Sequence, residues 1–182
     1  RMSESAERMG ATMCTLDVAW GEGATLAQIE DARKTHQPKV FAWIHGDTST
    51  TMAQPLDGVG ALCRKYGVLS YTDVTATLGG MPVRTDEWGI DVVSGGLQKC
   101  MAGPPGSAPI TISDRAAEHI MAPRHVDARI RAAGVHHRRR TPPLSNYFHL
   151  AIVIDSWSAQ RLHHHTHATP MLYPARDAAR IA

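Results

Sequence analysis

The side chain best suited to covalent chemistry is the amine of Lys99. It lies in the stretch DVVSGGLQKCMAGPPGSAPITIS, which runs from Asp91 to Ser113. Two glycines before the lysine permit close backbone approach and positive φ, and two prolines after it fix φ and prevent a helix. Most lysines are only solvated surface charges, but this pattern predicts a strand that delivers one lysine into a rigid turn.

Two other polar side chains follow apolar, strand-like runs in the same way. His45 comes directly after the run 39–44, and Asp73 comes directly after the run 67–72. Ligands of parallel sheets bind beyond the strand ends, so His45, Asp73 and Lys99 are expected to converge at one edge of the sheet. For Asp73 the alternative is a structural role, in which its carboxylate caps the next turn.

The elements that must position these groups alternate between strands and helices of moderate length. Thr25 and Gln28 have the spacing of a capping box, which predicts that a helix follows. Pro55 at a first helical turn predicts another. The expected strands are Thr12–Val18, Lys39–Ile44, Val68–Thr72, the run 90–93 that precedes the Lys99 turn, and Pro109–Ile112. The expected helices are Glu4–Met9, Leu26–Thr35, Leu56–Tyr66, Asp114–Met121 and the segment from Asn146 to Trp157. This order predicts an α/β fold with a mostly parallel sheet and helices on both faces.

Composition limits the class of protein. The chain has 182 residues, 43% of them hydrophobic, and a formal charge of +2, which is enough for one buried core. It has no run of eighteen apolar residues and no secretion signal, so we expect no membrane partner. Three widely spaced cysteines argue against a disulfide framework. We therefore expect a cytoplasmic protein.

Three ordered motifs together resemble a known family. They are HGDTSTTMAQPL from His45, YTDVTATLGG from Tyr71 and GIDVVSGGLQKCMAGPPGSAPITIS from Gly89. They resemble the core of class V, fold-type I pyridoxal-phosphate aminotransferases, in particular the ureidoglycine–glyoxylate, alanine–glyoxylate and serine–pyruvate enzymes. The spacing from Asp73 to Lys99 and the Gln-Lys pair match that pattern.

The resemblance implies a domain organisation. Residues 1–145 correspond to part of the large cofactor-binding domain, and residues 146–182 to a helical continuation with a dimer-interface segment. Family members are considerably longer, so the chain looks like an internal fragment that lacks the glycine-rich phosphate loop, the aromatic residue that stacks on the cofactor and the arginine that binds the substrate carboxylate. We expect the fragment alone to be inactive.

The resemblance also implies roles for individual residues. Lys99 forms the Schiff base with pyridoxal 5'-phosphate and carries the α-proton, and Asp73 keeps the ring nitrogen protonated. Three further residues match cofactor-binding positions: Thr48 near the phenolic oxygen, Thr75 against the ring face and Gln98 at the phosphate. The bland alternatives are that threonines in the loop satisfy their own backbone and that Gln98 is merely solvated.

The second half of the chain adds an expected dimer contact. The strings SNYF and QRL resemble the ureidoglycine subgroup, although His149 stands where that subgroup has an acidic residue. His-His-Thr, ending at Thr166, matches a motif that reaches the neighbouring subunit's cofactor phosphate. His163 occupies a position that is tyrosine in alanine–glyoxylate members and asparagine in ureidoglycine members. The resemblance thus implies a homodimer whose active site is shared between subunits.

The function implied is transamination from ureidoglycine, alanine or serine to glyoxylate, giving glycine, which for the ureidoglycine subgroup belongs to purine catabolism. A lyase of the same fold, such as a cysteine desulfurase, is a rival, but Cys100 is badly placed for a mobile loop cysteine. A different class of rival is a non-catalytic module that binds a polyanion or a metal through the basic run 124–140 and the histidines at 163–167. No aromatic residues are interleaved to stack on bases, and adjacent histidines rarely face one metal, so neither a nucleic-acid partner nor a metal is expected.

Overall fold

The computed structural model describes residues 2–122, 149–159 and 166–182. It divides into two compact units. The first comprises Arg1–Ser113 with Ala168–Ala182, and the second comprises Asp114–His167. In the described part of the chain, no helix is long and apolar enough to cross a membrane. The division that was expected after residue 145 falls among residues outside this description, and it stays a prediction.

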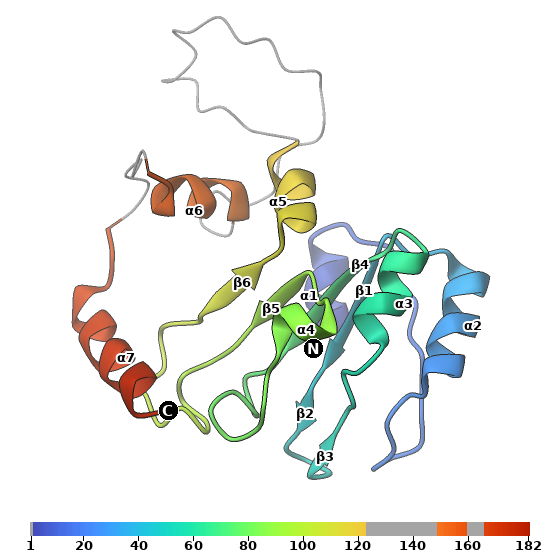
Figure 1. Ribbon diagram of the computed structural model, residues 1–182, viewed down its shortest axis with the longest axis horizontal. Coiled ribbons are helices and arrows are strands. Elements are labelled where there is room, and N and C mark those ends of the chain that lie inside the picture. The colour runs from blue at the N-terminus through green and yellow to red at the C-terminus, as the bar shows by residue number, and fades with distance from the viewer. Residues whose placement is uncertain (1, 123–148, 160–165) are drawn as a thin grey trace, which may run out of the picture. The chain divides into compact units, whose positions relative to one another are not determined.

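The first unit is built on a four-stranded sheet (Figure 1). Its strands, in spatial order, are β1 (Val40–Ile44), β4 (Leu69–Asp73), β5 (Val92–Ser94) and β6 (Ile110–Ile112). The first three are parallel and β6 is antiparallel to β5. The predicted α/β fold with a mostly parallel sheet is thus confirmed.

A small hairpin follows β1. It consists of β2 (Gly46–Asp47) and β3 (Met52–Ala53), which pair with each other in an antiparallel sheet of their own. The Asp47 carboxylate accepts hydrogen bonds from the Ser49 backbone N–H at 2.9 Å and the Thr50 hydroxyl at 2.8 Å. These bonds lower the pKa of Asp47, and the bond from the Ser49 backbone N–H has the largest effect. An ionised carboxylate therefore stabilises the tight turn of the hairpin.

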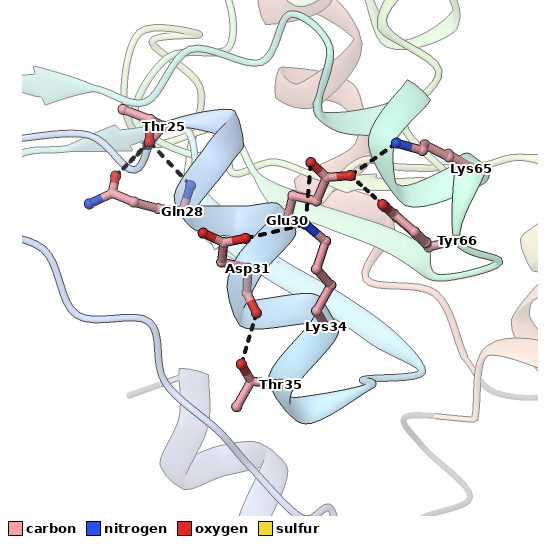
Figure 2. Close-up of polar contacts among 8 residues, drawn as sticks. All are labelled: Thr25, Gln28, Glu30, Asp31, Lys34, Thr35, Lys65 and Tyr66. Atoms are coloured by element: carbon pink, nitrogen blue, oxygen red, sulfur yellow. Dashed lines mark hydrogen bonds and ion pairs between the residues drawn. The ribbon is translucent and has the colours of Figure 1, made fainter.

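Helix α2 (Leu26–His36) begins where the capping box predicts. The Thr25 hydroxyl accepts a hydrogen bond from the Gln28 backbone N–H at 3.3 Å, and the Gln28 side chain accepts one from the Thr25 backbone N–H at 2.8 Å. Further along α2, Figure 2 shows the Lys65 ammonium and the Tyr66 hydroxyl on one side of the Glu30 carboxylate, and both donate to its Oε1. Those two bonds lower the pKa of Glu30 to about 2, and the bond from Tyr66 has the larger effect.

Helix α3 (Val59–Lys65) starts three residues later than the expected Leu56, because Gly58 adopts a left-handed conformation with φ 81° and serves as the N-cap. Its apolar face packs in one core with α2, with Val68 directly before β4, and with Phe41 and Trp43 of β1. The buried residues of this core are Ile29, Val59, Cys63 and Val68. The predicted apolar face of this helix therefore packs as expected, although its first turn does not form.

The remaining helices are short apart from the last. In the first unit, α1 covers Met2–Arg8, α4 covers Thr85–Trp88 and α7 covers Thr169–Ile181. In the second unit, α5 covers Asp114–Met121, with the predicted bounds, and α6 covers Leu150–Trp157. The expected beginning of α6 near Asn146 lies outside the described residues.

One strand prediction is wrong. Residues Thr12–Val18, in which Met13, Leu16 and Val18 are apolar, form no strand. A strand requires a neighbour that satisfies its backbone groups, and no strand of the described residues pairs with this segment. On its outer side β1 likewise has no partner strand in the part of the chain that the structure describes, and its Val40 and Ile44 are each 51% exposed.

Candidate active site

The ends of three parallel strands bring the predicted residues to one edge of the sheet. In register, Ile44 lies beside Asp73, and Asp73 lies beside Ser94. The β2–β3 hairpin and the loops that follow β4 and β5 lie at this end of the strands (Figure 1). The chain therefore delivers the hairpin, the Asp73 turn and the Lys99 turn to the same edge, as the sequence predicted.

Asp73 keeps one carboxylate oxygen available. Its Oδ1 accepts a hydrogen bond of 2.8 Å from the Thr75 backbone N–H, so Asp73 does cap its turn. Among the residues that the structure describes, no donor reaches its Oδ2. Asp73 is also only half-buried. The structural role and a binding role are thus compatible, because one oxygen holds the turn and the other can receive a cationic N–H.

Gly96 is the point at which Thr75 and Gln98 meet. A Cβ atom on Gly96 would lie 2.7 Å from the Thr75 methyl group and 2.7 Å from the Gln98 side-chain oxygen. Both distances are too short for real carbon contacts, so only glycine fits between these two side chains. The loops after β4 and β5 are therefore in direct contact, and two of the predicted cofactor-binding residues are neighbours.

The backbone of the Lys99 turn is held while its side chain is exposed. The Lys99 carbonyl accepts from the Ala102 N–H at 2.9 Å, and the Leu97 carbonyl accepts from the Gly103 N–H at 2.7 Å. The Leu97 side chain is buried, which anchors the turn in the protein interior. Lys99 makes no ion pair with any described residue. The structure therefore presents, on a fixed turn, an amine that makes no ion pair with the described residues and that a bound group can reach.

The Cys100 thiol ties the same turn to the loop after β4. Its Sγ lies 3.2 Å from the Ala76 carbonyl oxygen. A Cβ on Gly80 would lie 2.7 Å from this sulfur, so the glycine makes room for it. Cys100 thus contributes to the contact between the loops.

Two buried polar residues complete this edge of the sheet. His45 Nδ1 lies 2.7 Å from the Thr77 hydroxyl oxygen, and both residues are almost fully buried. Burial lowers the pKa of His45, because the cationic form loses its hydration. Sequence reasoning noted His45 at its strand end but missed Thr77. A polar residue four positions beyond a strand-end aspartate is a weak signal, because most such residues only satisfy local backbone groups.

The other predicted site residues are not brought into this arrangement. Thr48 is exposed in the turn between β2 and β3. Thr166 is exposed in the second unit, and His163 lies outside the described residues. Their roles stay predictions.

Comparison with known proteins agrees with this geometry. The family model of class V aminotransferases matches residues 2–168. The chain is 42% identical, over 99% of its length, to the (S)-ureidoglycine–glyoxylate transaminase of Bacillus subtilis, and 35% identical, over 94% of its length, to the alanine–glyoxylate aminotransferase of Oryctolagus cuniculus. These matches cover 44% and 40% of the relatives, so the chain spans less than half of their length.

Solved structures show the same likeness. The ureidoglycine–glyoxylate aminotransferase of Bacillus subtilis superposes with a TM-score of 0.86 at 40% identity, covering 99% of this chain and 42% of that one. The alanine–glyoxylate aminotransferase of a Nostoc species gives 0.85 at 34% identity, covering 100% and 44%. The family model matches most of the chain, so this chain belongs to the class V aminotransferases.

Class V aminotransferases use pyridoxal phosphate, and the residues present fit this group. It carries an aldehyde, a ring nitrogen that works best when protonated, and a phosphate. The exposed Lys99 amine suits the aldehyde, the unengaged Oδ2 of Asp73 suits the ring N–H, and the Gln98 amide beside Gly96 suits a phosphate oxygen. Rival lyases of the same fold type, such as the cysteine desulfurase of Thermococcus onnurineus, superpose with a TM-score of 0.54 at 18% identity, which shows the fold alone.

Proposed function

We propose that the protein is a transaminase that moves an amino group from ureidoglycine, alanine or serine to glyoxylate, giving glycine. One observation carries the proposal. Asp73, with one carboxylate oxygen unengaged, and Lys99, with an exposed amine, lie on loops that touch at Gly96. The relatives named above, which act on ureidoglycine or alanine with glyoxylate, support the choice of substrates.

Each residue of the chain has a definite task in this proposal. When bound, pyridoxal phosphate supplies an aldehyde and an electron-withdrawing ring. Lys99 would hold the aldehyde through its amine, and the same amine would move the α-proton of the amino donor. Asp73 holds the proton on the ring nitrogen through its charge. Gln98 orients the phosphate, Thr75 covers a ring face, and Thr48 donates its hydroxyl to the phenolic oxygen.

The proposal includes a homodimer. Its basis is the resemblance of the His-His-Thr string that ends at Thr166, whose hydroxyl would serve the cofactor phosphate of the partner subunit. His163, directly before this string, would lie near the same phosphate and the substrate. We also propose a cytoplasmic location, which the small number and wide spacing of the three cysteines support. The comparisons lend no support to a non-catalytic polyanion- or metal-binding module.

The first experiment tests Lys99. Protein expressed from its complete gene is incubated with pyridoxal phosphate, treated with borohydride and digested, and the modified peptide is identified by mass spectrometry. We expect the adduct on Lys99, no adduct and no turnover for Lys99→Ala, and wild-type behaviour for Lys39→Ala, which removes another exposed lysine. An adduct on a different lysine, or none, would overturn the assignment.

A second experiment tests Asp73. Asp73→Asn preserves the size of the side chain but removes the charge that favours the protonated ring. We expect turnover to fall by about 10²-fold or more, in line with loss of an electrostatic partner at a reacting group, while borohydride still fixes the cofactor on Lys99. Unchanged turnover would contradict the role of Asp73.

A third experiment addresses the amino donor through His163. Turnover with ureidoglycine, alanine and serine is compared for the wild type, His163→Asn and His163→Tyr, with glyoxylate as the acceptor. If this position sets donor preference, the asparagine variant shifts the ratio of kcat/KM values toward ureidoglycine and the tyrosine variant shifts it toward alanine. Equal ratios in all three proteins would exclude this role.

A further inference from the structure

The hydrogen bond between His45 and Thr77 joins the two loops that carry three of the proposed cofactor-binding residues. His45 lies directly after β1 and opens the hairpin that carries Thr48, and Thr77 closes the turn that begins at Asp73 and includes Thr75. Both side chains are buried, with 4% of His45 and 6% of Thr77 exposed. The bond is therefore shielded from water, where a lost partner costs more than at the surface.

The backbone N–H, the carbonyl and the Nδ1 atom of His45 all bond to residues of the hairpin and of the strand β4 with its following turn. Its backbone N–H donates to the Asp73 carbonyl at 2.9 Å, and its carbonyl accepts from the Gln54 N–H at 2.8 Å. Its ring meets Trp88 edge-on, with 6.2 Å between ring centroids. His45 thus bonds the β4 end through its backbone and the following turn through its side chain.

Thr77 is bonded on two sides as well. Its Oγ1 lies 3.3 Å from the Val74 carbonyl and 2.7 Å from His45 Nδ1. A hydroxyl has one hydrogen, so donation to Val74 leaves the oxygen to accept from an Nδ1–H tautomer of His45. Donation to His45 instead requires the other tautomer. In both cases the short His45 contact fixes the turn, and the Val74 contact is the longer one.

The packing around this bond leaves no room for adjustment. A Cβ on Gly46 would lie 2.5 Å from the Thr77 methyl group and 3.4 Å from the Ala76 Cβ. The hairpin and the turn therefore meet at van der Waals distance, with glycine at the contact. A shift of Thr77 would move Thr75, which lies two residues earlier and touches Gly96 beside the Lys99 turn.

We propose that His45 and Thr77 are positioning residues for the cofactor site: their bond sets the placement of Asp73 and Thr75 relative to the hairpin that carries Thr48. This inference rests on the proposed function, because it concerns how pyridoxal phosphate is held. Neither residue reacts. Their effect reaches the cofactor through Asp73 and Thr75.

The test compares Thr77→Val with Thr77→Ser in the protein expressed from its complete gene. Valine keeps the shape and the methyl group that packs against Gly46 but replaces the hydroxyl with a second methyl group, whereas serine keeps the hydroxyl and loses the methyl group. We measure the Kd for pyridoxal phosphate, the absorbance spectrum of the bound cofactor and the thermal midpoint of the cofactor-free protein. A positioning role predicts a Kd about tenfold higher and an altered spectrum for valine, with serine close to wild type in both.

His45 and a distant control complete the design. His45→Leu should reproduce the valine result, and His45→Asn, which can still bond Thr77, should restore most of the affinity. Ser113→Ala removes a hydrogen bond to Asp91 at the other end of the sheet, so it should lower the thermal midpoint without changing Kd or spectrum.

Two outcomes are decisive and distinguishable. If Thr77→Val and His45→Leu lower only the thermal midpoint, as Ser113→Ala does, the pair is merely structural and the inference is overturned while the proposed function stands. If the wild type itself gives no borohydride adduct on Lys99, the proposed function fails first.

Discussion

The Asp91 carboxylate accepts hydrogen bonds from both the backbone N–H and the hydroxyl of Ser70, at 2.8 and 2.9 Å. The Ser113 hydroxyl donates to the other carboxylate oxygen of Asp91 at 3.0 Å. Asp91 and Ser70 are fully buried. Asp91 precedes β5, Ser70 lies near the start of β4 and Ser113 follows β6, so one carboxylate fastens three strands at the end of the sheet opposite to Asp73 and Lys99.

Asp91→Asn should destabilise the fold strongly. An amide keeps the size of the side chain but has only one acceptor oxygen, so at least one buried donor loses its partner. Hydrogen bonds to charged groups contribute about 1.5–3 kcal/mol each, and we expect the free energy of unfolding to fall by that amount. Urea denaturation followed by circular dichroism measures it. Ser113→Ala removes only one of the three hydrogen bonds to this carboxylate, so a loss for Asp91→Asn no larger than that of Ser113→Ala would show that the charge is unimportant.

The Glu30 carboxylate predicts an acid-sensitive part of the stability. Its folded-state pKa is about 2, below the ordinary value of 4.5, because Tyr66 and Lys65 donate to it. The unfolded chain therefore takes up this proton first as the pH falls. The stabilisation is complete above pH 4.5 and is lost progressively toward pH 2.

Urea midpoints measured from pH 6 to pH 2 test this dependence. Glu30→Gln should lower the midpoint at pH 6 and flatten its decline below pH 4.5. Asp31→Asn, one residue along α2, removes the carboxylate that pairs with Lys34 at 3.3 Å and should leave the decline in place. The prediction is wrong if the urea midpoints of the two variants decline equally as the pH falls.

Gly60 should not tolerate alanine, although alanine is normally favoured in a helix by about 0.5–1 kcal/mol. A Cβ at this position in α3 would lie 2.1 Å from the Trp88 carbonyl oxygen and 2.5 Å from that of Gly89. We therefore expect Gly60→Ala to cost about 1–3 kcal/mol, as overpacking does. The exposed neighbour Ala61 is the control, since Ala61→Gly should cost only about 1 kcal/mol. A Gly60→Ala protein more stable than wild type would contradict the close approach of α3 to the end of α4.

Gly96→Ala should weaken cofactor binding. The added methyl group would displace the Gln98 amide or the Thr75 side chain, each 2.7 Å from the Cβ position. We expect the Kd for pyridoxal phosphate to rise about tenfold or more, measured by titration of the bound cofactor's absorbance. Gly60→Ala, far along the chain from this contact, should leave the Kd of the folded fraction unchanged.

The sequence predicts the local elements well where a side chain acts on its own backbone. Thr25 and Gln28 signal the start of α2 because both partners of the capping box lie within four residues. Gly58 is harder to read, because its left-handed φ decides where α3 starts and Pro55 suggests an earlier turn. Thr12–Val18 fails for a different reason. The apolar residues of this segment indicate an extended chain, but whether that chain is a strand depends on a neighbour elsewhere in the protein.

The site divides in the same way. The order of Asp73 and Lys99 after two parallel strands predicts that they share an edge, and topology alone ensures it. The meeting of Thr75 and Gln98 at Gly96, and of His45 and Thr77, depends on the exact path of three turns. Such contacts between loops leave no periodic signal in the sequence, so only the three-dimensional arrangement reveals them.

The outer side of β1 has a practical consequence for anyone who handles residues 1–182 as an isolated polypeptide. A strand that offers a row of backbone donors and acceptors is a template on which another extended segment can add. Val40 and Ile44 would contribute apolar contacts to such an addition, and Lys39, directly before the strand, is the charged residue that opposes it. Purification at low protein concentration, with light scattering to follow particle size, should therefore yield smaller species than purification at high concentration.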